Sequence, residues 1–211
     1  MACRFLLYFF TFCLIQGTFA QRLRYDAYKK DDMVGHMDVM VLTEGQRQTF
    51  DIESSMDFRF LISLKVRFHN HEVFDQGILE HGQVDNQMIG FKESHATIKR
   101  QINGYHLLIN DKHTPVEAQR ITYTVAKIYT QEPYNGQMVY SPYYGAFFTF
   151  EKVGPNEYRY SAPEGDNFYA YHEGVCTEVR LERDFATIRF KLKPEVLAAV
   201  KSNAANFRSN D

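Results

Sequence analysis

Hydrophobic and polar residues alternate along much of the chain, and this alternation predicts β-strands. In "FRFLISLKVRF", residues 58–68, six apolar side chains share one parity, and the other parity is mostly polar or charged. Because successive side chains on a strand point to opposite faces of a sheet, we interpret this segment as one long strand with a buried and a solvated face. The same pattern predicts further strands at residues 120–129, 145–153, 175–181 and 185–192.

Turn-forming residues separate these segments. Asn103–Gly104 and Asn135–Gly136 are pairs that tolerate the positive φ angles of tight hairpin turns. Short strands joined in this way are typical of antiparallel sheets packed face to face. We therefore expect an all-β fold of roughly ten to twelve strands, either an antiparallel β-sandwich or a jelly-roll-like arrangement. One C-terminal α-helix is predicted at residues 194–207, where Pro194 and Glu195 suit a first helical turn.

Residues 1–20 have the three parts of a secretory signal peptide: a short basic start, an apolar run over residues 5–15, and small residues before a cleavage point after Ala20. The apolar run is shorter than the roughly 20 residues that a helix needs to cross a bilayer, and no membrane span is expected. The mature protein is predicted to be secreted and extracellular. Residues 21–36 are interpreted as a charged, flexible lead-in, and residues 37–211 as a single β-rich domain that includes the helix.

Charge and motifs exclude several partners and chemistries. Loss of the signal peptide removes one positive charge and changes the formal net charge from −2 to −3, which is too close to neutral to indicate a nucleic-acid partner. The sequence has no Gly-x-Ser-x-Gly elbow, phosphate-binding glycine loop, dinucleotide fingerprint or His-Glu-x-x-His motif. No cofactor is expected.

Cys176 is the single cysteine left after removal of the signal peptide, so it has no possible partner within its own chain. In the predicted strand 175–181 it shares its parity with Glu178 and Arg180, which predicts an accessible thiol. Three interpretations stay open: a buried or inert thiol, an intermolecular disulfide formed in an oxidising compartment, and a nucleophile assisted by His172 or Glu178. If the thiol is accessible, a covalent homodimer linked through Cys176 follows.

His69 and His71 are two residues apart, so on a strand they would project from one face, as paired metal ligands do. If the long strand instead ends near Phe68, the pair lies in a solvated turn. A third metal ligand would come from among Glu72, His81 and His95.

Tyrosine is concentrated in residues 132–150 and 156–174, often beside proline, glycine, asparagine or serine. An apolar ring with a polar tip makes contacts at low entropic cost, and this composition is typical of recognition loops. The alternative is that the rings cover the ends of the sheets. The candidate binding residues are Tyr134, Tyr140, Tyr143, Tyr144, Tyr169 and Tyr171.

These observations favour a secreted, non-enzymatic recognition module that binds an extracellular protein or glycan through tyrosine-rich loops. A first alternative is an extracellular carrier of a small apolar ligand, with a pocket lined by some of its 18 Phe and 14 Tyr residues. A second alternative is a secreted hydrolase that uses a metal at His69 and His71 or a pair of carboxylates. Candidate carboxylate pairs are Glu44 with Asp51 and Glu178 with Asp184.

Overall fold

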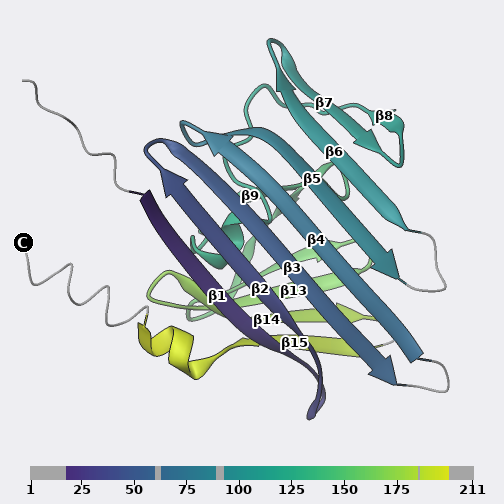
Figure 1. Ribbon diagram of the computed structural model, residues 1–211, viewed down its shortest axis with the longest axis vertical. Helices are drawn as coiled ribbons and strands as arrows, with labels where there is room; N and C mark the ends of the chain where they lie inside the picture. The colour runs from purple at the N-terminus through teal and green to yellow at the C-terminus, as the bar shows by residue number, and fades with distance from the viewer. Residues whose placement is uncertain (1–17, 60–62, 89–92, 185, 200–211) are drawn as a thin grey trace, which may run out of the picture.

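The computed structural model describes residues 18–59, 63–88, 93–184 and 186–199, and these residues form mainly antiparallel β-strands (Figure 1). The all-β fold class is therefore confirmed. The fifteen strands of the described residues, together with the 3₁₀ helix η1 (Lys127–Tyr129), are β1 (Thr18–Lys29), β2 (Asp32–Glu44), β3 (Arg47–Arg59), β4 (Ser63–Asp75), β5 (Ile78–Met88), β6 (Ser94–Gln101), β7 (Gly104–Ile109), β8 (Lys112–Thr114), β9 (Met138–Ser141), β10 (Ala146–Thr149), β11 (Glu151–Gly154), β12 (Glu157–Ala162), β13 (Gly165–His172), β14 (Val175–Arg183) and β15 (Ala186–Leu192).

Thirteen of these strands form one sheet in the order β11-β12-β13-β14-β15-β1-β2-β3-β4-β5-β6-β7-β8. Neighbours in the sheet are neighbours in the sequence, except where β15 pairs with β1. In Figure 1 strands β1–β8 form the front layer, and β13–β15 run across behind it. The sheet thus bends around to make a sandwich-like pair of layers, and its strand order is a meander without the crossing connections of a jelly roll.

A segment between β8 and β11 lies inside the bend. It contains η1 and a separate two-stranded sheet of β9 and β10, and Figure 1 shows η1 and β9 between the two layers. The predicted strand at residues 120–129 is wrong: this part has one isolated bridge, from Thr124 to Tyr140, and the turn of η1. Its apolar pattern arises because side chains such as Ile121 and Ile128 are buried in the core.

The single strand predicted at residues 58–68 is also wrong. Residues 58–59 end β3 and residues 63–68 begin β4, and the two strands pair with each other around residues 60–62, which lie outside the described residues. The alternation misled because apolar residues continue on one parity from one strand into the next. As a result β4 extends to Asp75, well beyond Phe68.

The charged lead-in predicted at residues 21–36 is regular structure instead, because it forms most of β1 and the start of β2. Of the predicted signal peptide, residues 1–17 lie outside the described residues, and residues 18–20 are exposed at the start of β1. Within the described part of the chain, Leu23 is the first residue with a buried side chain. Cleavage after Ala20 would therefore leave the described core complete.

The C-terminal helix begins at Pro194, as predicted, and continues to Ala199, where the described part of the chain ends. The remainder of the predicted helix, residues 200–207, lies outside the described residues. No helix among the described residues is both long and apolar enough to cross a membrane.

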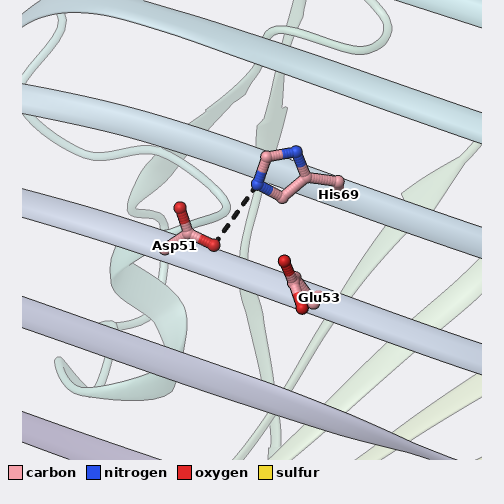
Figure 2. Close-up of side chains that lie close together, drawn as sticks. All are labelled: Asp51, Glu53 and His69. Atoms are coloured by element: carbon pink, nitrogen blue, oxygen red, sulfur yellow. Dashed lines mark hydrogen bonds and ion pairs between the residues drawn. The ribbon is translucent and has the colours of Figure 1, made fainter.

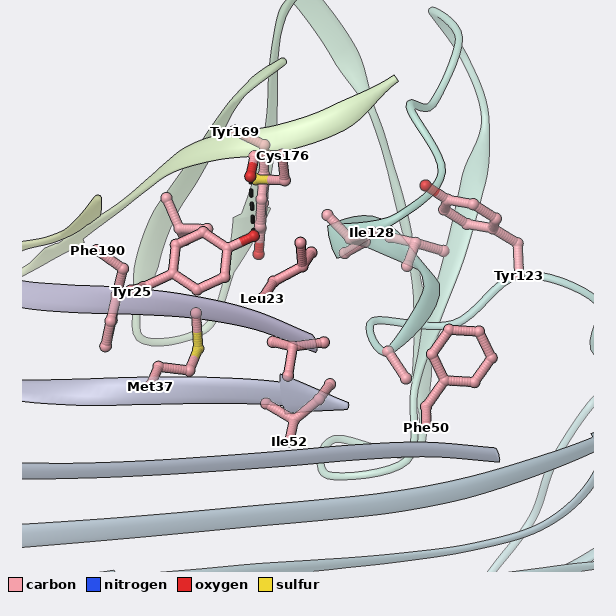
Figure 3. Packing of buried hydrophobic residues seen from close by; sticks show 14 of the residues in the cluster. Leu23, Tyr25, Met37, Phe50, Ile52, Tyr123, Ile128, Tyr169, Cys176 and Phe190 are labelled. Carbon is pink, nitrogen blue, oxygen red and sulfur yellow. Dashed lines mark hydrogen bonds between the residues drawn. The ribbon is translucent and has the colours of Figure 1, made fainter. Parts of the chain in front are cut away.

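Side chains from both layers and from the inner segment meet in one core (Figure 3). Leu23 and Tyr25 of β1 and Phe50 of β3 have at most 2 % of their surface exposed. The Tyr25 hydroxyl donates a hydrogen bond of 2.8 Å to the backbone oxygen of Cys176, which satisfies a polar group that would be costly to bury alone. Inward-pointing side chains of β1–β5 therefore contribute to the core, and the outward-pointing side chains of the same strands face solvent.

Candidate functional site on the outer face of the sheet

The six candidate tyrosines do not share one environment. Tyr140 in β9 and Tyr169 and Tyr171 in β13 are at most 5 % exposed, so their prediction as loop residues is wrong. Burial raises the pKa of Tyr169 and of Tyr171 well above the ordinary value. Tyr143 and Tyr144 are partly buried and pack edge to face at 4.8 Å between ring centroids. Tyr134, at 68 % exposed, is the candidate that presents most of its ring to solvent.

Cys176 is fully buried, and the prediction of an accessible thiol is wrong. A β-bulge explains the error: Ala170 of β13 pairs with Glu178, but the next residue, Tyr171, pairs with Cys176. Thr177 is therefore an extra residue that reverses the alternation and turns Cys176 inward. The thiol Sγ lies 3.5 Å from the backbone oxygen of Glu178, and burial raises the thiol pKa. The predicted covalent homodimer required an accessible Cys176 thiol, and the buried thiol removes the support for it.

Inner and outer side chains alternate over residues 50–53 of β3 and residues 69–72 of β4. Phe50 and Ile52 of β3 are buried in the core, so Asp51 and Glu53 point outward. In β4, Asn70 and Glu72 point inward and are buried, so His69 and His71 point outward. The prediction that both histidines project from one face of a strand is thus confirmed, and the alternative of a solvated turn is wrong.

Pairing of the strands places ionisable residues opposite one another across the outer face. Each member faces the next at a directly opposed position on the neighbouring strand, where side chains on the same face interact. We call this set the outer row; it consists of Asp38 (β2), Glu53 (β3), His69 (β4), Asp85 (β5) and His95 (β6).

The carboxylates near the two ends of the outer row have partners. Arg22 and Arg24 of β1 each place a nitrogen 2.9 Å from Asp38 Oδ1. Partial burial raises the pKa of Asp38, but the hydrogen bonds and charges of Arg24 and Arg22 outweigh it, so that the pKa of this carboxyl is lowered.

Asp85 is held in a similar way, with its Oδ1 2.5 Å from His95 Nδ1 and its Oδ2 accepting a hydrogen bond from the Gln83 amide. Burial again opposes the change, and the hydrogen bonds from His95 and Gln83 lower the pKa of Asp85.

The middle of the outer row forms a compact cluster with Asp51 (Figure 2). One ligand atom each from Asp51, Glu53 and His69 lie within 4.8 Å of one another. His69 Nε2 is 3.3 Å from Asp51 Oδ1, and His71 Nδ1 makes a 3.0 Å hydrogen bond with the other oxygen, Asp51 Oδ2. The Glu53 carboxylate has no hydrogen-bond or ion-pair partner among the described residues. We call Asp51, Glu53 and His69 the outer cluster.

The three third ligands proposed from the sequence do not join the outer cluster. Glu72 is fully buried on the inner face of β4. His95 is engaged with Asp85. His81 lies beside His71, with 6.3 Å between ring centroids, and burial lowers its pKa.

A surface hollow of about 410 Å³ adjoins the outer cluster. Glu53 and His69 belong to both, so a group bound to the cluster would border the hollow. The remaining lining residues come from β2 to β5: His36, Asp38, Ser54, Ser55, Arg67, Phe68, Asp85 and Gln87.

Sequence reasoning missed Glu53 and used Asp51 only as half of a carboxylate pair. A usable signal is present in "FDIE", residues 50–53, where acidic residues alternate with apolar ones as they do on a half-buried strand. What the sequence does not give is the register that brings this stretch beside His69 and His71.

Comparison with known proteins identifies a family and a distant structure. The family model described as Domain of unknown function (DUF6134) matches residues 25–193, from β1 to just beyond β15. A solved structure, a beta-barrel-like protein of the domain of unknown function DUF1849 from Brucella abortus, aligns over 82 % of this chain and 95 % of its own, with 11 % identity and a TM-score of 0.48. No curated protein has significant similarity to the chain.

Proposed function

The chain belongs to the family DUF6134, and from the geometry of its outer face we propose that it is an extracellular, non-enzymatic binding module that holds a divalent cation in the outer cluster. The observation that carries this proposal is the convergence of donor atoms from Asp51, Glu53 and His69 within 4.8 Å. The cation would be the point through which the module contacts its partner.

The donor set suits a first-row divalent cation. Two carboxylates and one imidazole are the donors that favour ions such as Mn²⁺ and Zn²⁺, and three protein ligands leave coordination positions open for water or a partner. A cation would also relieve the repulsion between the carboxylates of Asp51 and Glu53, which project from the same face of β3.

His71 has the position of a residue that orients a ligand. Its Nδ1 bonds to Asp51 Oδ2, and this leaves Asp51 Oδ1 directed toward His69. Partners of this kind fix the orientation of metal ligands, and their loss typically costs 10–100-fold in metal affinity.

The site replaces the tyrosine-rich loops as the proposed recognition surface, because three of those six tyrosines are buried. Secretion remains part of the proposal and rests on the signal-peptide pattern of residues 1–20. The carrier alternative has less support, because the described hollow has a largely polar lining and the described interior is filled with side chains such as Tyr25, Phe74 and Phe150.

The proposal is tested by titrating Mn²⁺ into the purified protein and measuring free Mn²⁺ by electron paramagnetic resonance. We expect one Mn²⁺ ion per chain for the wild type and at least about tenfold weaker binding for Glu53→Gln and His69→Ala. Glu44→Gln is the matched control, because Glu44 is an exposed carboxylate at the end of β2 outside the cluster. Absence of binding to the wild type, or equal binding by Glu53→Gln and Glu44→Gln, would overturn the proposal.

A further inference from the structure

The hollow beside the outer cluster has two chemically different walls. One wall is the outer row, represented by Glu53 and His69. The other is a parallel row two residues along the strands, whose members are also directly opposed: His36, Ser55, Arg67 and Gln87. We call this second set the donor row, because each member can donate a hydrogen bond from its side chain.

The floor between the walls is backbone. Ser54 and Phe68 line the hollow and pair with each other across β3 and β4. They lie on the opposite parity from both rows, so their side chains point inward. The two walls therefore stand about one strand repeat apart, roughly 7 Å, with open space above the paired strands.

Two unpaired charges of opposite sign border this space. Asp38 is paired with Arg22 and Arg24, and Asp85 is hydrogen-bonded to His95 and Gln83, which leaves Glu53 as the carboxylate of the outer row without a partner among the described residues. In the donor row the Arg67 guanidinium is exposed and has no hydrogen-bond or ion-pair partner among the described residues. Glu53 and Arg67 are diagonal neighbours on paired strands, and they do not form an ion pair.

We infer that the hollow binds an oxyanion, a phosphate or carboxylate group of the partner, and that it does so only when a cation occupies the outer cluster. This inference rests on the proposed function. A guanidinium presents a planar fork of donors that matches both kinds of oxyanion, and Ser55 and Gln87 flank Arg67 with further donors. One oxygen of the anion would complete the coordination of the cation, and the others would face Arg67.

The dependence on a cation follows from the charges. Without a cation, an anion in the hollow meets the Glu53 carboxylate on one wall, and this repulsion cancels the attraction of Arg67 on the other. A divalent cation bound by Asp51, Glu53 and His69 neutralises the two carboxylates and offers the anion an open coordination position. Because coupling between two ligands is reciprocal, the anion must strengthen binding of the cation by the same factor as the cation strengthens binding of the anion.

The test uses methylphosphonate and acetate as probes, titrated by calorimetry into the wild-type protein with and without saturating Mn²⁺. We expect binding of at least one probe to be about tenfold or more tighter in the presence of Mn²⁺, and the stronger of the two identifies phosphate or carboxylate as the natural group. Arg67→Gln should lose this gain and keep the wild-type affinity for Mn²⁺ measured without a probe. Arg47→Gln, an outer-face arginine paired with Glu80 away from the hollow, is the matched control.

The outcomes separate this inference from the proposed function. If Mn²⁺ does not bind, both are wrong. If Mn²⁺ binds but the probes bind equally well without it, or equally well to Arg67→Gln and Arg47→Gln, the oxyanion site is wrong and the cation site stands.

Discussion

Glu53 and Glu72 lie on the paired strands β3 and β4 but in opposite environments, because Glu53 points outward to solvent and Glu72 points inward to the core. Glu53 is exposed and has no described partner. Glu72 is fully buried, accepts hydrogen bonds from the Thr124 hydroxyl and from the Asn70 amide at 2.9 Å, and lies near Lys127. A glutamate thus contributes to packing and hydrogen bonding when it lies on the inner face of the sheet, and is available to a ligand when it lies on the outer face.

The inner carboxylate ties the inner segment to the sheet. Thr124 and Lys127 belong to the segment that contains η1. The Lys127 ammonium donates a hydrogen bond of 2.8 Å to the backbone oxygen of Thr122, and it lies over the Phe74 ring of β4. Burial raises the pKa of Glu72 to about 7 and lowers the pKa of Lys127 to about 8. Polar side chains on the inner face, such as Glu72 and Lys127, therefore affect the stability of the fold. Polar side chains on the outer face, such as Glu53, remain available to bind a ligand.

The largest expected effect separates inner from outer tyrosines. Tyr169 stacks on Tyr160 and meets Phe150 edge to face, so Tyr169→Ala should lower the free energy of unfolding by about 3–5 kcal/mol, as large-to-small changes in a core do. Tyr134→Ala, the matched exposed variant, should change it by less than about 0.5 kcal/mol. Urea denaturation followed by circular dichroism measures both. Similar losses in the two variants would contradict the assignment of faces.

The next effect is a pH dependence due to Glu72. Burial raises the pKa of Glu72 to about 7 in the folded protein, from an ordinary value of 4.5, so its contribution to stability is fully present below pH 4.5 and is lost as pH rises through 7. The unfolding free energy of the wild type relative to Glu72→Gln should therefore fall by about 3 kcal/mol between pH 4 and pH 9. Urea denaturation across this range, with both proteins in the same buffers, gives the difference.

The low-pH limb serves as the internal control for that experiment. Below pH 4.5 the wild-type carboxyl is protonated and resembles the glutamine amide, so the two proteins should be similar in stability there. A difference that stays constant from pH 4 to pH 9 would contradict the burial of an ionisable Glu72.

The smallest effect concerns Cys176. Cys176→Ala should cost about 1 kcal/mol, because it removes one small buried group from the core, and urea denaturation should detect the change. In the native protein the thiol should not react with Ellman's reagent, and it should react fully in denaturant, since burial raises its pKa and excludes the reagent. Rapid labelling of the native protein, or a reducible dimer on gels, would restore the accessible thiol predicted from the sequence.

Alternation predicted the fold class and several strands because it reports which side chains a sheet buries. It identified the strands that became β14 and β15 within about two residues. It failed where burial has another cause: residues 120–129 are apolar because they cross the interior, not because they form a strand. It also failed at Cys176, where a single extra residue in one strand reverses the parity.

The candidate site was half predictable. The spacing of His69 and His71 placed both on one face of a strand, and the structure agrees. Their neighbours Asp51 and Glu53 are about twenty residues earlier in the chain and reach them through the register of the β3–β4 pair. Register depends on which residues of the two strands pair, and alternation within one strand carries no information about it.

The pairing of β1 with β15 also constrains the order of folding, because β1 cannot complete its pairing before β15 is present. These two strands are the first and last of the sheet, and they pair in its middle, with Tyr25 opposite Leu192. A chain made from its N-terminus exposes one edge of β1 until β15 (Ala186–Leu192) has also been made. Contacts of such large sequence separation form slowly, and an unpaired strand edge invites association with other chains. The two halves of the described sheet can join only when β15 is available to pair with β1.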